Sequence, residues 1–247
     1  MLPRDSGAMI RRRLDYRPPA FLVDTLDLAF DLDATATRVT AKLAFRRNPA
    51  AAPEDANAPL VLDGEQQKDV RVELDGRTLS AARLAVAECT LTVRDPPASG
   101  TLIVHSEIAP ANNVALEGLY LSSGVFCTQC EAEGFRRITY FPDRPDVLTR
   151  YTVTIRADRA RYPVLLSNGN LVASGENWAK FEDPYPKPSY LFALVAADLD
   201  ACQQEGDDLV CTSSWRLWVK TRQAGPSIKL VFRVSTAPPT STPTPQR

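Results

Sequence analysis

The sequence predicts a mostly-β protein built from antiparallel sheets, and three observations support this fold class. Apolar and polar residues alternate with period two in many short segments, long segments with the 3.6-residue period of a helix are absent, and 20 prolines stand against 11 glycines. Alternation of this kind is typical of strands that bury one face and leave the other in water. Frequent prolines favour short strands joined by turns.

The strand signals are clearest in the first half of the chain. Residues 26–32 and 39–45 alternate strictly, and a hairpin is predicted where residues 70–74 run into Asp75–Gly76. Two further strands are expected at residues 91–93 and 102–104. The apolar positions of the first two strands, expected on one buried face, are Leu26, Leu28, Phe30 and Leu32, followed by Val39, Ala41, Leu43 and Phe45.

A second set of strands is expected after residue 150. Residues 151–155 alternate, and the runs at 164–167 and 170–172 flank Asn168–Gly169, which predicts another hairpin. Strands at 178–182 and 190–196 complete the set. The sequence therefore predicts one sheet-rich domain from residue 15 to residue 199.

Composition excludes several classes of partner. The 29 basic residues balance 30 acidic ones, so a nucleic-acid surface is not expected. No apolar run approaches the ~18 residues of a membrane span, and no signal peptide is recognisable, so we expect no membrane partner and a cytoplasmic location. Five cysteines, an odd number, agree with a reducing compartment.

The two ends of the chain carry weaker patterns. Residues 1–14 are expected to form a flexible N-terminus, and residues 200–222 the beginning of a linker. The last part, residues 223–247, ends in TAPPTSTPTPQR and is expected to be disordered because it offers too little apolar surface to offset the entropy of ordering.

Residues 115–147, ALEGLYLSSGVFCTQCEAEGFRRITYFPDRPDV, form the most informative stretch. They resemble, almost letter for letter, the substrate-anchoring segment of the bacterial aminopeptidase N family, zinc-dependent alanyl aminopeptidases of the gluzincin class. Blocks at 15–49, 60–65 and 150–199 follow the same family in the right order. Pro142 departs from it, since the family usually carries Leu there.

The resemblance implies a saddle-like, sandwich-type N-terminal β domain that packs against a thermolysin-like catalytic domain. That catalytic domain, and the N-terminus of a peptide substrate, are therefore the implied partners. The family pattern is lost after Val219, and a frameshift or truncation before the catalytic domain is the expected cause.

The zinc chemistry of the family is not expected in this chain. A gluzincin needs a His-Glu-x-x-His motif on a helix, whereas this sequence contains one histidine, His105, within an apparent strand. We therefore expect no metal ligands, no catalytic residues and no cofactor here. The zinc would belong to the complete family enzyme, and the chain alone is expected to be inactive.

The resemblance assigns substrate-binding roles to two residues. Glu131 is the implied anchor for the α-ammonium group of the substrate, and Gln129 the implied wall of the pocket for the first side chain. A carboxylate in a partly desolvated pocket suits an ammonium ligand. Ala132, which follows the anchor, matches a family position where the preceding peptide bond is cis.

Other interpretations of the same region remain open. Cys127 and Cys130 imitate a metal or redox motif, but two reduced thiols in a loop are expected, because neither a second close cysteine pair nor a βαβ unit accompanies them. Charged residues after the anchor are expected to form ion pairs that fix the loop: Arg136, Arg137, Asp143, Arg144 and Asp146.

The aromatic side chains are expected in the core or at a domain interface: Tyr140, Phe141, Trp178, Tyr185 and Tyr190. Two alternative functions also remain open. The chain could be an independent β-sandwich module that binds a peptide or a carbohydrate, or a structural interaction domain. An exposed apolar surface near residues 129–131 would favour the aminopeptidase interpretation, because a missing partner domain leaves such a surface uncovered.

Overall fold

The computed structural model describes residues 16–205, 208–211, 216–220 and 229–230. Its largest element is an eight-stranded sheet in the order β13-β14-β11-β1-β2-β8-β4-β5. In chain order, its strands are β1 (Phe21–Asp31), β2 (Thr37–Arg47), β4 (Lys68–Leu74), β5 (Arg77–Thr78), β8 (Ser99–Ile108), β11 (Thr149–Arg156), β13 (Asn170–Gly175) and β14 (Trp178–Lys187).

Three smaller sheets accompany the long one. The first has the order β12-β15-β10-β9, the second β3-β7-β6 and the third β17-β16-β18-β19. Their strands are β3 (Leu60–Asp63), β6 (Leu84–Val86), β7 (Thr90–Val93), β9 (Gly118–Ser122), β10 (Val125–Gln129), β12 (Val164–Ser167), β15 (Leu194–Ala197), β16 (Asp200–Glu205), β17 (Asp208–Cys211), β18 (Arg216–Lys220) and β19 (Lys229–Leu230).

The helical elements among the described residues are short 3-10 turns. They are η2 (Pro53–Asn57), η3 (Pro110–Asn112), η4 (Phe135–Arg137) and η5 (Ser189–Leu191). None of the described helices is long and apolar enough to cross a membrane. The mostly-β prediction is therefore confirmed.

The long sheet buries one face, as the alternation predicts. Leu26, Leu28 and Phe30 of β1 are buried together with the apolar positions of β2, while Leu32 is only partly buried. A bulge between Val23 and Thr25 shifts the register of β1 against β2, so that apolar residues on both sides of the bulge point to the same face. Polar residues such as Asp27 and Lys42 are exposed on the other face.

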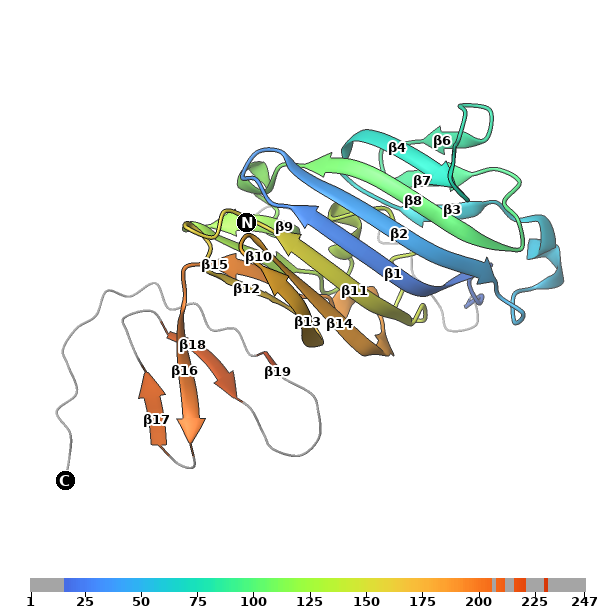
Figure 1. Ribbon diagram of the computed structural model, residues 1–247. Coiled ribbons are helices and arrows are strands. Elements are labelled where there is room, and N and C mark those ends of the chain that lie inside the picture. The colour runs from blue at the N-terminus through green and yellow to red at the C-terminus, as the bar shows by residue number, and fades with distance from the viewer. Residues whose placement is uncertain (1–15, 206–207, 212–215, 221–228, 231–247) are drawn as a thin grey trace, which may run out of the picture.

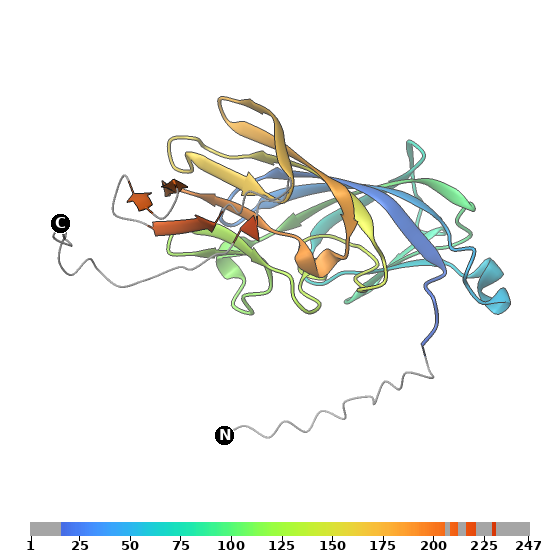
Figure 2. The same cartoon turned by 90° about the horizontal axis from the view of Figure 1, so that it is seen from below.

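Two of the smaller sheets cover the buried face of the long sheet near its two ends, one formed by β9, β10, β12 and β15 and the other by β3, β6 and β7 (Figures 1 and 2). Between them, the segment that follows β10 supplies core side chains of its own. Phe135 is fully buried, with ring centroids 5.3 Å from those of Phe141 and Phe192 and 6.2 Å from that of Tyr151 on β11. The stretch of residues 115–147 thus contributes to the core through Phe135 and Phe141.

Several local predictions are confirmed and others need correction. The Asp75–Gly76 hairpin joins β4 to β5, with φ of 48° and 75° at its two turn residues. The chain is not wholly antiparallel, because β1 and β11 are parallel neighbours. Part of the strand expected at 190–196 is instead η5, and β15 begins only at Leu194.

The hairpin predicted around Asn168–Gly169 is wrong. β12 pairs with β15 in a small sheet, whereas β13 pairs with β14 in the long one, so this turn carries the chain between sheets. Gly169 has φ +86°, and a Cβ there would lie 2.3 Å from the Glu182 carbonyl oxygen. Turn chemistry thus fixes where the chain reverses but not which strand it meets next.

Predictions for the chain ends fall largely outside the described residues. The expected flexible N-terminus at 1–14 lies there entirely, as does the expected disordered tail at 223–247 apart from β19. Residues 200–222, expected to begin a linker, include β16, β17 and β18.

Candidate functional site

Gln129 and Glu131 lie together at the end of strand β10. Gln129 is the last residue of the strand and pairs with Gly118 at the start of β9, and Glu131 follows after one buried residue, Cys130. Both polar side chains are exposed, and the Gln129 Nε2 donates a hydrogen bond of 3.2 Å to the Glu131 carbonyl oxygen. The two predicted site residues therefore share one exposed rim.

The turn that carries Glu131 has the cis peptide bond that the resemblance implies, between Glu131 and Ala132. The turn closes where the Gly134 amide donates a 2.9 Å hydrogen bond to the Cys130 carbonyl oxygen. A Cβ at Gly134 would lie 2.5 Å from the Gln129 carbonyl oxygen and 3.0 Å from the Gly118 nitrogen. Glycine is required at residue 134 because the turn packs directly against the β9–β10 backbone.

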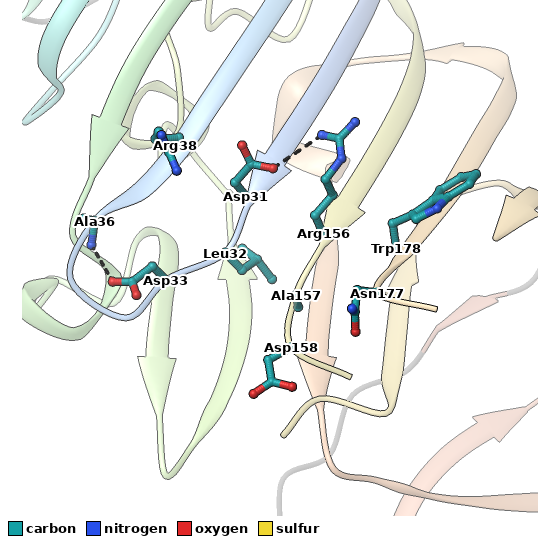
Figure 3. A pocket seen from close by; sticks show the side chains of 10 residues that line it. All are labelled: Asp31, Leu32, Asp33, Ala36, Arg38, Arg156, Ala157, Asp158, Asn177 and Trp178. Carbon is teal, nitrogen blue, oxygen red and sulfur yellow. Dashed lines mark hydrogen bonds and ion pairs between the residues drawn. The ribbon is translucent and has the colours of Figure 1, made fainter. Parts of the chain in front are cut away.

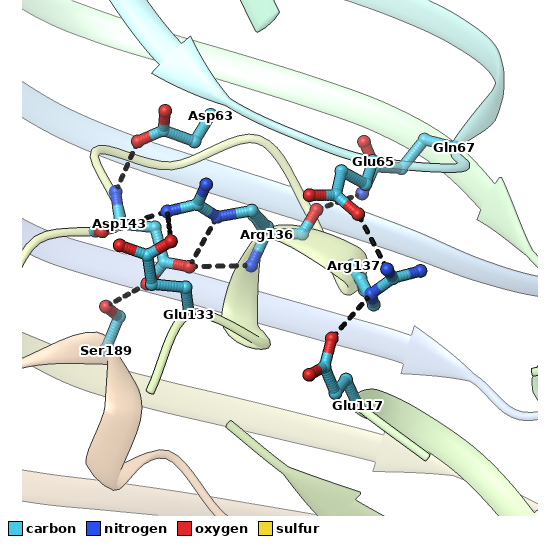
Figure 4. Close-up of polar contacts among 9 residues, drawn as sticks. All are labelled: Asp63, Glu65, Gln67, Glu117, Glu133, Arg136, Arg137, Asp143 and Ser189. Carbon is cyan, nitrogen blue, oxygen red and sulfur yellow. Dashed lines mark hydrogen bonds and ion pairs between the residues drawn. The ribbon is translucent and has the colours of Figure 1, made fainter. Parts of the chain in front are cut away.

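Charged side chains form ion pairs along residues 129–146, as predicted, and we call this stretch the braced segment (Figure 4). Arg136 pairs with Asp143 at 3.1 Å, and Arg144 pairs with Asp146 at 2.7 Å. Arg137 instead pairs with two residues from outside the cluster, Glu65 at 2.8 Å and Glu117 at 3.1 Å. Ion pairs thus tie the segment both to itself and to distant parts of the chain.

Of the two thiols near the anchor, Cys130 is buried and Cys127 is partly buried. Burial raises the pKa of the Cys130 thiol far above its ordinary value, and burial also raises the pKa of Cys127. Tyr120 of β9 pairs with Cys127 of β10. Burial and a hydrogen bond with that thiol raise the pKa of Tyr120 to about 12. The thiols stay protonated at neutral pH, and both are free cysteines.

The described residues do not offer a ligand set for a catalytic zinc. Across the described ranges, no group of three or more His, Cys, Asp or Glu side chains is arranged to hold a metal ion. His105 lies in β8, where its Nδ1 is 3.1 Å from the Thr40 hydroxyl oxygen and its Nε2 is 3.8 Å from a Glu73 carboxylate oxygen. These contacts make His105 a strand residue with ordinary polar neighbours.

An open hollow of about 560 Å³ lies elsewhere, where β1 and β11 end and β2 and β14 begin (Figure 3). It is lined by Asp31, Leu32, Asp33, Ala36, Arg38, Arg156, Ala157, Asp158, Asn177 and Trp178. Its polar groups do not converge on a common point. The Asp33 carboxylate accepts hydrogen bonds from the backbone amides of Thr35 and Ala36, which lower its pKa. Its role is therefore to stabilise the turn between β1 and β2.

The aromatic residues divide between the core and the surface. Tyr140 and Phe141 are buried, Trp178 and Tyr190 are half-buried, and Tyr185 is exposed. These five residues therefore do not form one continuous exposed stripe.

Sequence reasoning missed the distant partners of the braced segment. Ser189 and Asp63 both contact Asp143, although they are separated from it by 46 and 80 residues. Gln67 contacts the backbone of Arg136 across 69 residues. No local sequence pattern predicts such contacts, because they depend on how the long sheet and the two smaller sheets on its buried face are packed.

The sequence profile of the peptidase M1 N-terminal domain matches residues 63–191, and the chain belongs to this family.

Curated relatives sharpen the family assignment. The chain is similar to aminopeptidase N from Caulobacter vibrioides, with 54% identity over 191 residues, and to aminopeptidase N from Escherichia coli, with 50% identity over 193 residues. The first match covers 75% of this chain and the second 76%, but each covers only 21% of the relative. This chain thus spans about a fifth of the length of these relatives.

A solved structure agrees with both comparisons. Legionella pneumophila aminopeptidase A, determined in complex with aspartic acid, superimposes with a TM-score of 0.73 at 34% identity, over 78% of this chain and 23% of that one.

Proposed function

We propose that this chain supplies the part of a zinc-dependent aminopeptidase that holds the free N-terminus of a peptide substrate. Glu131 accepts hydrogen bonds from the substrate α-ammonium group, and Gln129 lines the pocket for the first side chain. The observation that carries this proposal is the shared exposed rim at the end of β10, within the stretch that matches aminopeptidase N relatives. Charge-assisted hydrogen bonds suit an ammonium ligand.

Exposed apolar residues beside the rim support a missing partner domain. Val114 and Leu116 precede β9 and are 91% and 54% exposed, and β9 is the strand that pairs with Gln129. Large apolar side chains next to a polar site are typical of a surface that another domain covers. These exposed residues favour the aminopeptidase interpretation over a free-standing binding module.

The chain does not perform the hydrolysis alone under this proposal. The metal would polarise the scissile carbonyl group and activate water, and its ligands would come from outside these 247 residues. Residues of this chain bind and orient the substrate amine. The rest of the enzyme would supply the zinc ligands and the general base.

Kinetics of the complete enzyme test the role of Glu131. Residues 16–199 are joined to the remaining part of the Caulobacter vibrioides relative, and Glu131→Gln is compared with the parent on an alanyl amide substrate. Because hydrogen bonds to charged groups contribute about 1.5–3 kcal/mol, kcat/KM should fall roughly ten- to a hundred-fold.

The matched control is Glu182→Gln, which makes the same charge change on β14 at an exposed carboxylate paired with Lys180. It should leave kcat/KM within about twofold, as is usual for surface substitutions. Equal kcat/KM values for parent and Glu131→Gln would contradict the proposal.

A further inference from the structure

Asp143 is the most deeply buried carboxylate of the braced segment. Its side chain is 1% exposed and lies against Arg136 and Ser189 (Figure 4). One carboxylate oxygen accepts hydrogen bonds from the Arg136 Nε at 3.1 Å and the Arg136 backbone amide at 3.2 Å, and the other accepts from the Ser189 hydroxyl at 2.5 Å. At this depth, Asp143 cannot itself touch a substrate.

The backbone of Asp143 extends the same connections. Its amide donates a 3.0 Å hydrogen bond to the Asp63 carboxylate at the end of β3, and its carbonyl oxygen accepts one of 3.4 Å from the Arg136 guanidinium group. Phe141 and Asp63 exchange two backbone hydrogen bonds, of 2.9 and 3.0 Å. Asp143 therefore joins three separate parts of the chain: β3, η4 and η5.

The connection continues from η4 to the anchoring turn. Arg136 belongs to η4, which Gly134 immediately precedes, and the Gly134 amide closes the turn on the Cys130 carbonyl oxygen. Gly134 also packs against the Gln129 carbonyl oxygen with no room for a Cβ. A displacement of the Arg136 backbone would therefore shift residues 130–134, the turn that carries Glu131.

We propose that Asp143 is a positioning residue, which through Arg136 and Ser189 holds the turn of residues 130–134 so that Glu131 meets the substrate amine. This inference rests on the proposed function for its kinetic consequence, but its structural part stands alone. A buried carboxylate with several charge-assisted hydrogen bonds can fix a loop to within the tolerance that a binding site needs.

Hydrogen exchange on the chain itself tests the structural part. In Asp143→Asn, the amides of Gly134, Arg137 and Ile138, which are all hydrogen-bonded within the turn and η4, should exchange roughly ten- to a hundred-fold faster, the range expected for loss of hydrogen bonds to a charged group. Amides between β1 and β2 should change much less. Equal acceleration at both places would overturn the proposal, because the effect would then be global.

Two further variants complete the exchange experiment. Asp146→Asn removes an arginine-paired carboxylate three residues away, and it should leave the turn amides within about threefold of the parent. Acceleration of these amides to the level seen in Asp143→Asn would overturn the assignment to Asp143. If Asp143→Asn does not fold, Ser189→Ala removes only one of the hydrogen bonds, and unchanged exchange of the turn amides in that variant would overturn the proposal.

A double-mutant cycle in the joined enzyme tests the kinetic part. Asp143→Asn should lower kcat/KM roughly ten- to a hundred-fold in the parent, mainly through KM, but have little further effect in Glu131→Gln, because it acts through Glu131. Full additivity would contradict positioning while leaving the anchor intact. No effect of Glu131→Gln alone would instead contradict the proposed function, so the two failures are distinguishable.

Discussion

The braced segment at residues 129–146 and the hollow lined by Asp31, Arg156 and Trp178 each contain an Asp–Arg ion pair, but the two pairs differ in burial. In the braced segment, the Asp143 carboxylate is 1% exposed and has three hydrogen bonds at its oxygens. In the hollow, Asp31 and Arg156 are about half exposed and meet at 3.4 Å. A buried, hydrogen-bonded ion pair can restrict the backbone beside it, whereas a half-exposed pair contributes little.

The largest difference between the regions should come from their aromatic residues. Phe135→Ala removes a fully buried ring that contacts three other aromatic rings, and it should lower the free energy of unfolding by about 3–5 kcal/mol. Trp178→Ala in the half-buried wall of the hollow should cost clearly less. Urea unfolding of both variants measures this, and equal losses would remove the energetic distinction between the regions.

A smaller effect, with a defined pH dependence, is expected at Asp146. Hydrogen bonds from Arg144, and a further one from Tyr16, hold the pKa of Asp146 below its usual value. Asp146→Asn should cost about 0.5–1 kcal/mol at neutral pH.

Since the folded pKa is depressed, this contribution is complete above the unfolded value near 4 and is lost as the pH falls through the folded value. Unfolding curves of parent and Asp146→Asn should therefore converge below about pH 4. A difference that grew as the pH fell would show that the ion pair is not its source.

The smallest effect is expected in the hollow. Asp31→Asn breaks an exposed ion pair, and it should change the free energy of unfolding by no more than about 0.5 kcal/mol, with any change suppressed by added salt. Chemical denaturation at low and high salt measures it. A loss of several kcal/mol would mean that the hollow is as tightly coupled to the fold as the braced segment.

The sequence predicted what local chemistry controls. Alternation placed Leu26, Leu28 and Phe30 on a buried face, and the Asp75–Gly76 turn gave its hairpin. It could not predict that β12 and β13 separate into different sheets, because pairing partners depend on the stacking of distant strands.

The site shows the same division between local and distant information. Gln129 and Glu131 were proposed from a family resemblance carried by contiguous residues. Ion pairing within the charged cluster that contains Arg136 and Asp143 was also predicted, but not which residues pair. The contacts of Asp63 and Ser189 with Asp143 were not predicted, since neither residue lies near Asp143 in sequence. The burial of the Arg136–Asp143 ion pair could not be predicted either, because it depends on how the sheets pack together.

The affinity of the joined enzyme for a ligand with and without its amino group tests the role of Glu131 most directly. Inhibition constants are measured for L-leucinamide and for its analogue with hydrogen in place of the amino group, in the parent and in Glu131→Gln. The parent should prefer the amine, and the preference should fall roughly ten- to a hundred-fold in the variant, because the proposed anchor contacts the amino group that only one of the two ligands carries. A preference that is the same in parent and variant would show that Glu131 does not bind the substrate amine.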